Sequence, residues 1–235
     1  MTSPAEPGRP SADRAALEIV TVCARLWERG LIAGPDGNVS VRLDDGRILM
    51  TPAGMSKCDV RAGDLVVLEP DGRVVSGGQP SSEAGMHLHA YRRRPDVGAV
   101  VHAHPPTATG FAVAGEGLMA DVLPEIILQV GRVRLLPYAT PGSPAVAAAF
   151  EPWIEREDAF LLANHGATTL GPSLSVAHRR MESVEHAARI LLTAHQLGRV
   201  NRLTPDQVLQ LETQRSAART IPVGHPGMTP GEEIR

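Results

Sequence analysis

Aromatic residues are scarce in this chain, because Phe, Trp and Tyr together make up 3% of its 235 residues. The hydrophobic core is therefore expected to consist of Ala, Val, Leu and Ile, and a catalytic phenol could come only from Tyr91 or Tyr138. Cysteine is also rare, since the chain has two, Cys23 and Cys58, and neither belongs to a CxxC motif. This number excludes a disulfide framework and favours a reduced, cytoplasmic protein.

Long apolar segments and an excess of one charge are missing as well. No apolar run approaches the roughly 20 residues that span a bilayer, and residues 1–14 have no apolar core typical of a signal peptide. A formal net charge of −3 provides no basic surface for nucleic acid or acidic membranes. We therefore expect neither a nucleic-acid partner nor a membrane partner.

The apolar periodicity predicts one domain, residues 12–218, between a disordered tail at 1–11 and a loose segment at 219–235. Asp-Gly turns at 45–46 and 71–72 each join two short apolar runs into a hairpin. Further strands are expected at 99–104, 131–140 and 159–171, and helices at 11–32, 80–96, 143–154, 173–198 and 204–218. Antiparallel hairpins interleaved with helices indicate an α/β or α+β layered domain.

Two histidines end an apolar run in the stretch AVVHAHPP at residues 99–106. Side chains two positions apart in a strand point to the same face, so His102 and His104 present their imidazoles side by side. Pro105 and Pro106 end the run because proline has no N–H for a ladder. Two neighbouring imidazoles can bind a metal ion, although two solvated histidines at a loop edge explain the pair as well.

A catalytic zinc ion needs three protein ligands and an open position. His165 is the natural third ligand, since it lies at a turn beside Gly166, although by itself it would be a buried, hydrogen-bonded histidine. Glu83, in PSSE at the start of an expected helix, supplies a carboxylate or acts only as a capping residue. His87 lies one turn further along that helix and could face the same site.

Three clusters of small hydrogen-bonding residues lie at GNVS (37–40), TPAG (51–54) and the serine pair at 81–82. Amides, hydroxyls and exposed glycine N–H groups can together hold a phosphate, although turns use the same residues. Lys57 could add a positive charge, but a surface position is the simpler explanation for this residue.

Together these motifs resemble the class II aldolase/adducin-head superfamily, which includes L-fuculose-1-phosphate aldolase and L-ribulose-5-phosphate 4-epimerase. The resemblance covers roughly residues 13–200 and also rests on RPDVGAVVHAHPP, PYATPGS and LLANHG. It implies an α/β/α sandwich around a mostly antiparallel sheet, in a homotetramer with active sites between subunits. It also implies a Zn²⁺ cofactor, with Mn²⁺ or Co²⁺ as alternatives.

The resemblance assigns roles to individual residues of this chain. The metal site is implied to consist of three histidines with one carboxylate beside them: His102, His104, His165 and Glu83. Substrate phosphate is implied to bind at Asn38, Gly54, Ser81 and Ser82. Two positions depart from the family pattern, because Ala53 stands where a Thr or Ser is common, and residues 121–131 contain no tyrosine.

The implied activity is zinc-dependent cleavage of a ketose phosphate similar to L-fuculose 1-phosphate, giving dihydroxyacetone phosphate and an aldehyde. The alternatives at the same site are a dehydratase of the methylthioribulose-1-phosphate type, an epimerase or a decarboxylase. A further alternative is a non-catalytic binding module like the adducin head, which the complete set of three histidines and Glu83 disfavours. Glu83 is expected to abstract a proton, and Glu125, in an apolar segment that raises its pKa, to donate one.

Overall fold

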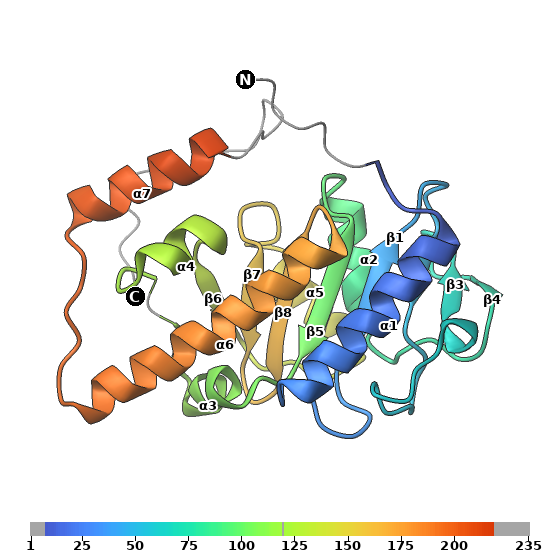
Figure 1. Ribbon diagram of the computed structural model, residues 1–235, viewed down its shortest axis with the longest axis horizontal. Helices are drawn as coiled ribbons and strands as arrows, with labels where there is room; N and C mark the ends of the chain where they lie inside the picture. Colours follow the sequence, from blue (N-terminus) through green and yellow to red (C-terminus); the bar gives the residue numbers. More distant parts are fainter. Residues whose placement is uncertain (1–7, 119, 219–235) are drawn as a thin grey trace.

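The computed structural model describes residues 8–118 and 120–218 (Figure 1). Within these residues one sheet of eight strands has the order β4-β3-β2-β1-β5-β8-β7-β6. Its strands are β1 (Asn38–Arg42), β2 (Ile48–Met50), β3 (Val66–Leu68), β4 (Val74–Ser76), β5 (Ala99–Ala103), β6 (Val133–Leu136), β7 (Ala159–Leu162) and β8 (Gly166–Gly171). Neighbouring strands are antiparallel except β6 and β7, which are parallel.

Helices cover both faces of this sheet, so the fold has three layers. The helices are α1 (Ala12–Glu28), the short 3-10 helix η1 (Ala62–Asp64), α2 (Ala84–Arg93), α3 (Pro106–Ala114), α4 (Pro124–Gln129), α5 (Pro144–Phe150), α6 (Leu174–Gln196) and α7 (Pro205–Ala218). Figure 1 shows α1 and α6 across one face, with α2 and α5 behind the sheet. The expected α/β fold with a mostly antiparallel sheet is confirmed. No helix within the described ranges has the length and apolar character needed to cross a membrane.

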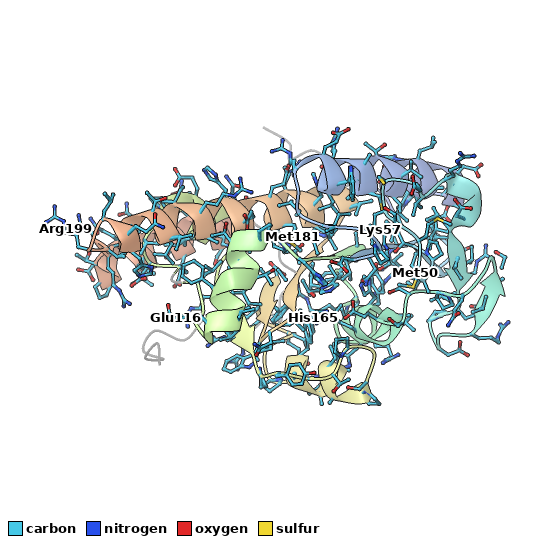
Figure 2. The ribbon with its side chains drawn as sticks, turned by 90° about the horizontal axis from the view of Figure 1, so that it is seen from below. Met50, Lys57, Glu116, His165, Met181 and Arg199 are labelled. Carbon is cyan, nitrogen blue, oxygen red and sulfur yellow. The ribbon has the colours of Figure 1, made fainter. Side chains whose placement is uncertain are left out.

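Each face of the sheet has its own hydrophobic core, because side chains alternate along a strand. In β5, Val101 and Ala103 belong to the core under α1 and α6, whereas Val100 belongs to the core under α2 and α5. Figure 2 labels one fully buried methionine from each core, Met181 on α6 and Met50 in β2. His102 follows Val100 by two positions, so its imidazole lies on the α2 side of the sheet.

The elements agree with the sequence pattern at both hairpins, at the strand that carries His102 and at the two C-terminal helices. Two short helices, α3 and α4, were not expected. Pro106 ends the strand region as predicted, but it also begins α3, because proline is favoured in the first turn of a helix. The predictions for the two tails fall mainly on residues 1–7 and 219–235, which lie outside the described residues. Within the described part of the N-terminal tail, Arg9 donates a hydrogen bond to the Pro95 carbonyl.

A buried cluster of charges joins the C-terminal helices to the sheet. Asp158, just before β7, has a side chain only 1% exposed, and its carboxylate pairs with three arginines from α7, α6 and the end of α2. The N···O distances are 3.0 Å to Arg94, 3.0 Å to Arg180 and 3.2 Å to Arg215. The carboxylate therefore holds together three helices that are distant in the sequence.

We expect Asp158→Ala to destabilise the fold by about 3–5 kcal/mol, because it removes the carboxylate that pairs with Arg180 and Arg215 and one of the two that pair with Arg94. Urea denaturation followed by circular dichroism measures the change. Asp45→Ala is the matched control, since Asp45 pairs with Arg47 on the exposed hairpin turn, and its unfolding midpoint should stay at the wild-type value. Equal midpoints for the two variants would show that the cluster does not stabilise the protein.

Candidate metal site

A row of polar side chains crosses the sheet beneath the N-terminus of α2. Asn38 in β1 pairs in register with His102 in β5, and His102 pairs in register with Thr168 in β8. All three residues are at least 97% buried. Because paired residues of neighbouring strands face the same side of a sheet, the row gathers an amide, an imidazole and a hydroxyl at one place.

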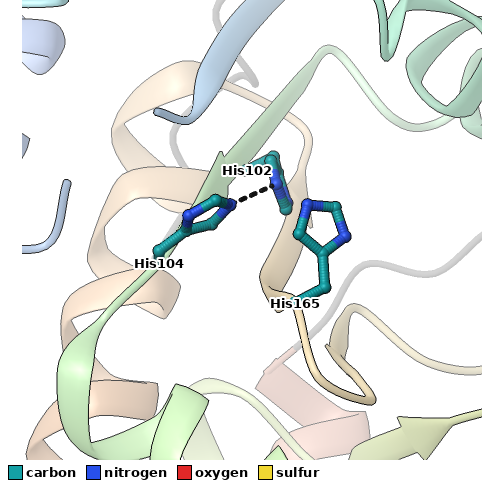
Figure 3. A group of neighbouring side chains, drawn as sticks. All are labelled: His102, His104 and His165. Carbon is teal, nitrogen blue, oxygen red and sulfur yellow. Dashed lines mark hydrogen bonds between the residues drawn. The ribbon is translucent and has the colours of Figure 1, made fainter. Parts of the chain in front are cut away.

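Three histidines converge at this end of the sheet (Figure 3). His102 is the last residue but one of β5, His104 follows the strand, and His165 lies in the turn between β7 and β8. The ring centroids of His102 and His104 are 5.1 Å apart, and that of His165 lies 4.8 Å from His102 and 5.1 Å from His104. One ring nitrogen from each histidine lies within 4.8 Å of the other two.

The turn that carries His165 depends on a glycine and on a left-handed residue. Asn164 has φ of 57°, a conformation that Asn tolerates better than most residues. A Cβ atom at Gly166 would lie 2.5 Å from His104 Cδ2 and 2.6 Å from the Ala103 carbonyl oxygen. Glycine at 166 therefore allows the turn to approach His104 closely enough to complete the group of three.

The facing ring nitrogens of His102 and His104 lie within hydrogen-bond distance of each other. Nδ1 of His102 lies 3.1 Å from the Thr168 hydroxyl, and when that hydroxyl donates to the Met86 sulfur, His102 donates its Nδ1–H. In the neutral ring Nε2 then presents a lone pair. That atom lies 3.2 Å from Nε2 of His104 and 3.2 Å from Oε2 of Glu83. Such a group of electron donors fits a divalent cation.

Glu83 completes the group from the start of α2. Its side chain is 9% exposed, and its carboxylate accepts a 2.9 Å hydrogen bond from the Asn38 amide. Oε1 lies 3.5 Å from His165 Nε2, and within the described residues it is buried without a hydrogen-bond partner. Burial by itself would raise the pKa of Glu83, but the neighbouring histidines and the Asn38 amide hold that pKa below its usual value. The carboxylate is therefore ionised.

Burial favours the neutral form of two histidines of the triad, His104 and His165. Burial lowers the pKa of His165 to about 4, and burial also lowers the pKa of His104. A neutral imidazole can donate a lone pair to a metal, whereas a protonated one cannot. The set of donors, nitrogen from three imidazoles with oxygen nearby, suits Zn²⁺ and other first-row divalent metals.

With this geometry in view, the chain can be compared with known proteins. The class II aldolase and adducin N-terminal domain matches residues 17–192. The chain belongs to this family. It is 34% identical over 207 residues to the 3-oxo-tetronate 4-phosphate decarboxylase of Haemophilus influenzae, across 86% of this chain and 98% of that protein.

Aldolases of the family are similarly related to the chain. It is 36% identical over 198 residues to the 5-deoxy-D-ribulose 1-phosphate aldolase of Bacillus thuringiensis, across 83% of this chain and 92% of that protein. A solved structure of an L-fuculose 1-phosphate aldolase superposes with a TM-score of 0.81 at 32% identity, across 88% of this chain and 98% of that one. The chain is thus a family enzyme of sugar-phosphate metabolism with the histidine triad of a divalent metal site.

Behind Glu83, this chain has a line of buried hydrogen bonds that sequence reasoning found only in part. His87 Nε2 lies 2.5 Å from the Asn38 side-chain oxygen, and His87 Nδ1 lies 2.7 Å from the Ser40 hydroxyl. Ser40 in turn lies 2.8 Å from the Tyr91 hydroxyl. Burial lowers the pKa of His87 to about 3, so the ring is neutral. The line fixes the Asn38 amide with its nitrogen toward Glu83.

Three of the residues expected to bind phosphate, Gly54, Ser81 and Ser82, lie on loops, and the fourth, Asn38, begins β1. Ser81 is buried and its hydroxyl accepts from the Glu83 backbone N–H, whereas Ser82 and Gly54 are exposed. Asn38 donates from its amide to Glu83, and the second hydrogen of that nitrogen can still reach a substrate. The expectation that Lys57 lies on the surface was wrong, because its side chain is buried and bonded to two backbone carbonyls.

Glu125 stands apart from this group within one chain. It lies in the first turn of α4, and its side chain is exposed. The sequence predicted apolar surroundings for Glu125, but in the structure its neighbours Ile126 and Ile127 are the residues buried in the core. A role for Glu125 therefore depends on a neighbouring subunit and stays a prediction.

We expect His102→Ala to lose bound metal, because it removes the central nitrogen of the triad and the partner of Glu83. His89→Ala is the matched control, since His89 lies on α2 and pairs with Glu151 instead. Inductively coupled plasma mass spectrometry of each purified variant gives the metal content per chain. Retention of one tightly bound metal by His102→Ala would contradict the site.

Proposed function

We propose that this enzyme is a metal-dependent carbon–carbon lyase that cleaves a phosphorylated ketose into dihydroxyacetone phosphate and an aldehyde. The observation that carries the proposal is the convergence of three imidazoles, with the carboxylate of Glu83 beside two of them. Family membership supports a sugar phosphate as the substrate, and the 36% identity to an aldolase of a ketose 1-phosphate supports the reaction.

His102, His104 and His165 would hold the ion, with Zn²⁺ as the proposed metal and Mn²⁺ or Co²⁺ as alternatives. Because imidazoles are neutral ligands, the bound ion keeps its full charge and supplies Lewis-acid stabilisation of negative charge on substrate oxygens. The residues of the chain then have two tasks, which are to move protons and to hold the phosphate.

Proton movement is assigned to Glu83. In the cleavage, a hydroxyl loses its proton, the carbon–carbon bond breaks, and its electron pair moves to the adjacent carbonyl to give the enediolate of dihydroxyacetone phosphate. A proton must then be added to the enediolate carbon. Glu83 is ionised and held in place by Asn38, so it can accept a proton, hold it and return it to carbon.

Phosphate binding is assigned to Asn38 at the start of β1 and to three loop residues, Gly54, Ser81 and Ser82. The loop that contains Gly142 packs against this segment, since a Cβ there would lie 3.0 Å from the Ser82 carbonyl oxygen. Binding a phosphate away from the reacting carbons orients the substrate and contributes binding energy to the transition state. Ala53 provides no hydroxyl, so the backbone N–H groups and serines must supply the donors.

Decarboxylation of a phosphorylated 3-oxo acid is the second candidate. The 34% identity to a 3-oxo-tetronate 4-phosphate decarboxylase across nearly its whole length favours it. Loss of CO₂ from that compound leaves the same enediolate of dihydroxyacetone phosphate, so the roles of the triad and Glu83 are unchanged. No hydroxyl has to lose its proton in this reaction, which suits a chain without a tyrosine in residues 121–131.

A substrate panel separates these reactions. The zinc-loaded enzyme is incubated with L-fuculose 1-phosphate, 5-deoxy-D-ribulose 1-phosphate and 3-oxo-tetronate 4-phosphate, with Glu83→Gln as the inactive control. Dihydroxyacetone phosphate with an equal amount of aldehyde is the expected result. Dihydroxyacetone phosphate with CO₂ establishes the decarboxylase, and water loss or inversion at one carbon would establish a dehydratase or an epimerase. A chain that binds no metal and turns over nothing would be a binding module.

The two glutamates are expected to differ in a hydrogen-exchange assay with dihydroxyacetone phosphate in D₂O, followed by proton NMR. Glu83→Gln should abolish exchange of the substrate C–H, because an amide cannot take up that proton. Glu125→Gln should retain exchange and slow only complete turnover, and the exposed Glu116→Gln serves as control. Loss of exchange in both variants, or wild-type turnover by Glu125→Gln, would refute this division.

A contribution from Glu125 requires a second subunit beside the triad, so we propose a homotetramer with sites between subunits. Analytical ultracentrifugation at the concentration of the activity assay gives the oligomeric state. A fully active monomer would show that the active site is not shared between subunits and that one chain carries out the cleavage by itself.

A further inference from the structure

The loop between α1 and β1 brings a carboxylate to the outer side of the histidine triad. Oδ2 of Asp36 lies 3.3 Å from Nδ1 of His104, and the Asp36 side chain is 43% exposed. The other ring nitrogen of His104, Nε2, lies 3.2 Å from Nε2 of His102 (Figure 3). Since an ionised carboxylate only accepts hydrogen bonds, it selects the tautomer of His104 that carries hydrogen on Nδ1.

The backbone of this loop is held against the triad. The His104 backbone N–H donates to the Leu31 carbonyl at 3.0 Å. Gly37 has φ of 71°, and a Cβ there would lie 2.8 Å from the His102 carbonyl oxygen, so the loop touches the strand that carries the histidines. The Asp36 N–H closes a turn by donating to the Ala33 carbonyl at 3.0 Å.

A buried ammonium group fixes the same loop from inside. Lys57 is the only lysine in the sequence, and its side chain is 3% exposed. Its Nζ donates to the Pro35 carbonyl at 2.7 Å and to the Met55 carbonyl at 2.8 Å. These bonds join the residue before Asp36 to the loop at 51–55, where we place part of the phosphate site. The position of Asp36 is therefore set by backbone contacts as well as by its own charge.

We propose that Asp36 is a positioning residue that orients His104 and strengthens metal binding at the triad. This inference rests on the proposed metal-dependent function. His102 receives the equivalent support from the neutral Thr168 hydroxyl, whereas His104 receives it from a charged group. A carboxylate partner makes an imidazole a stronger donor to a metal, and loss of such a partner typically weakens binding about 10- to 100-fold.

Zinc affinity of the full chain tests this role. The protein is stripped with a chelator, and the dissociation constant for Zn²⁺ is measured by competition with a chromophoric chelator. Asp36→Ala is expected to bind zinc about 10- to 100-fold more weakly than wild type. Asp36→Asn should recover part of this loss, because its amide oxygen still accepts from Nδ1. Asp59→Ala, which removes an exposed aspartate from another loop, should bind as wild type.

A spectroscopic readout separates orientation of the ring from general damage. In the Co²⁺-loaded proteins, Asp36→Ala should change the visible absorption bands of the metal, whereas Asp59→Ala should leave them as in wild type. Wild-type zinc affinity and an unchanged cobalt spectrum in Asp36→Ala would overturn the inference while leaving the metal site intact. If the wild-type chain itself binds neither ion, the proposed function fails together with this inference.

Discussion

The site depends on one electrostatic constraint, which is that ring nitrogens of the triad and a carboxylate oxygen of Glu83 lie close together in a buried place. When His102 donates from Nδ1 to Thr168, its Nε2 faces both His104 and Glu83 as an acceptor. In this tautomer the facing lone pairs repel one another unless a proton or a cation lies between them. The surrounding structure holds them in place, and a bound metal removes the repulsion.

The sheet supplies most of this organisation through its register. Asn38, His102 and Thr168 lie side by side because β1, β5 and β8 pair at those positions. The N-terminus of α2 then places Glu83 over the row, and the Asn38 amide links the carboxylate to buried His87. A stiff group of this kind suits catalysis, because donors that are already oriented need no rearrangement during the reaction.

The sequence was informative where the chemistry depends on local spacing. The i, i+2 spacing of His102 and His104 predicted a shared face, and the Asp-Gly turns predicted both hairpins. His165 and Glu83 lie far from that pair along the chain, so periodicity did not connect them to it. The need of a catalytic zinc ion for a third ligand suggested His165, and the family resemblance implied both residues. The resulting fold prediction was confirmed by the layered sheet and by the superposition on a solved aldolase.

Contacts between distant segments could not be predicted in this way. The sequence around Lys57 did not indicate that its side chain is buried. Its ammonium group donates to the backbone carbonyls of Pro35 and Met55, and sequence patterns do not identify such partners. The contact of Asp36 with His104 likewise arises from packing between the α1–β1 loop and the end of β5. Glu125 is exposed in the single chain, so any group in contact with it would come from another subunit. The apolar periodicity of one chain cannot predict such contacts.

X-ray absorption at the zinc edge of the loaded protein tests the electrostatic account most directly. The account predicts three imidazole nitrogens at about 2.0–2.1 Å from the metal, with oxygen in the remaining coordination. It also predicts that His102→Ala removes this signature while His89→Ala retains it. Coordination by sulfur, or by fewer than two imidazoles in the wild-type protein, would contradict the claim that the triad exists to hold the cation.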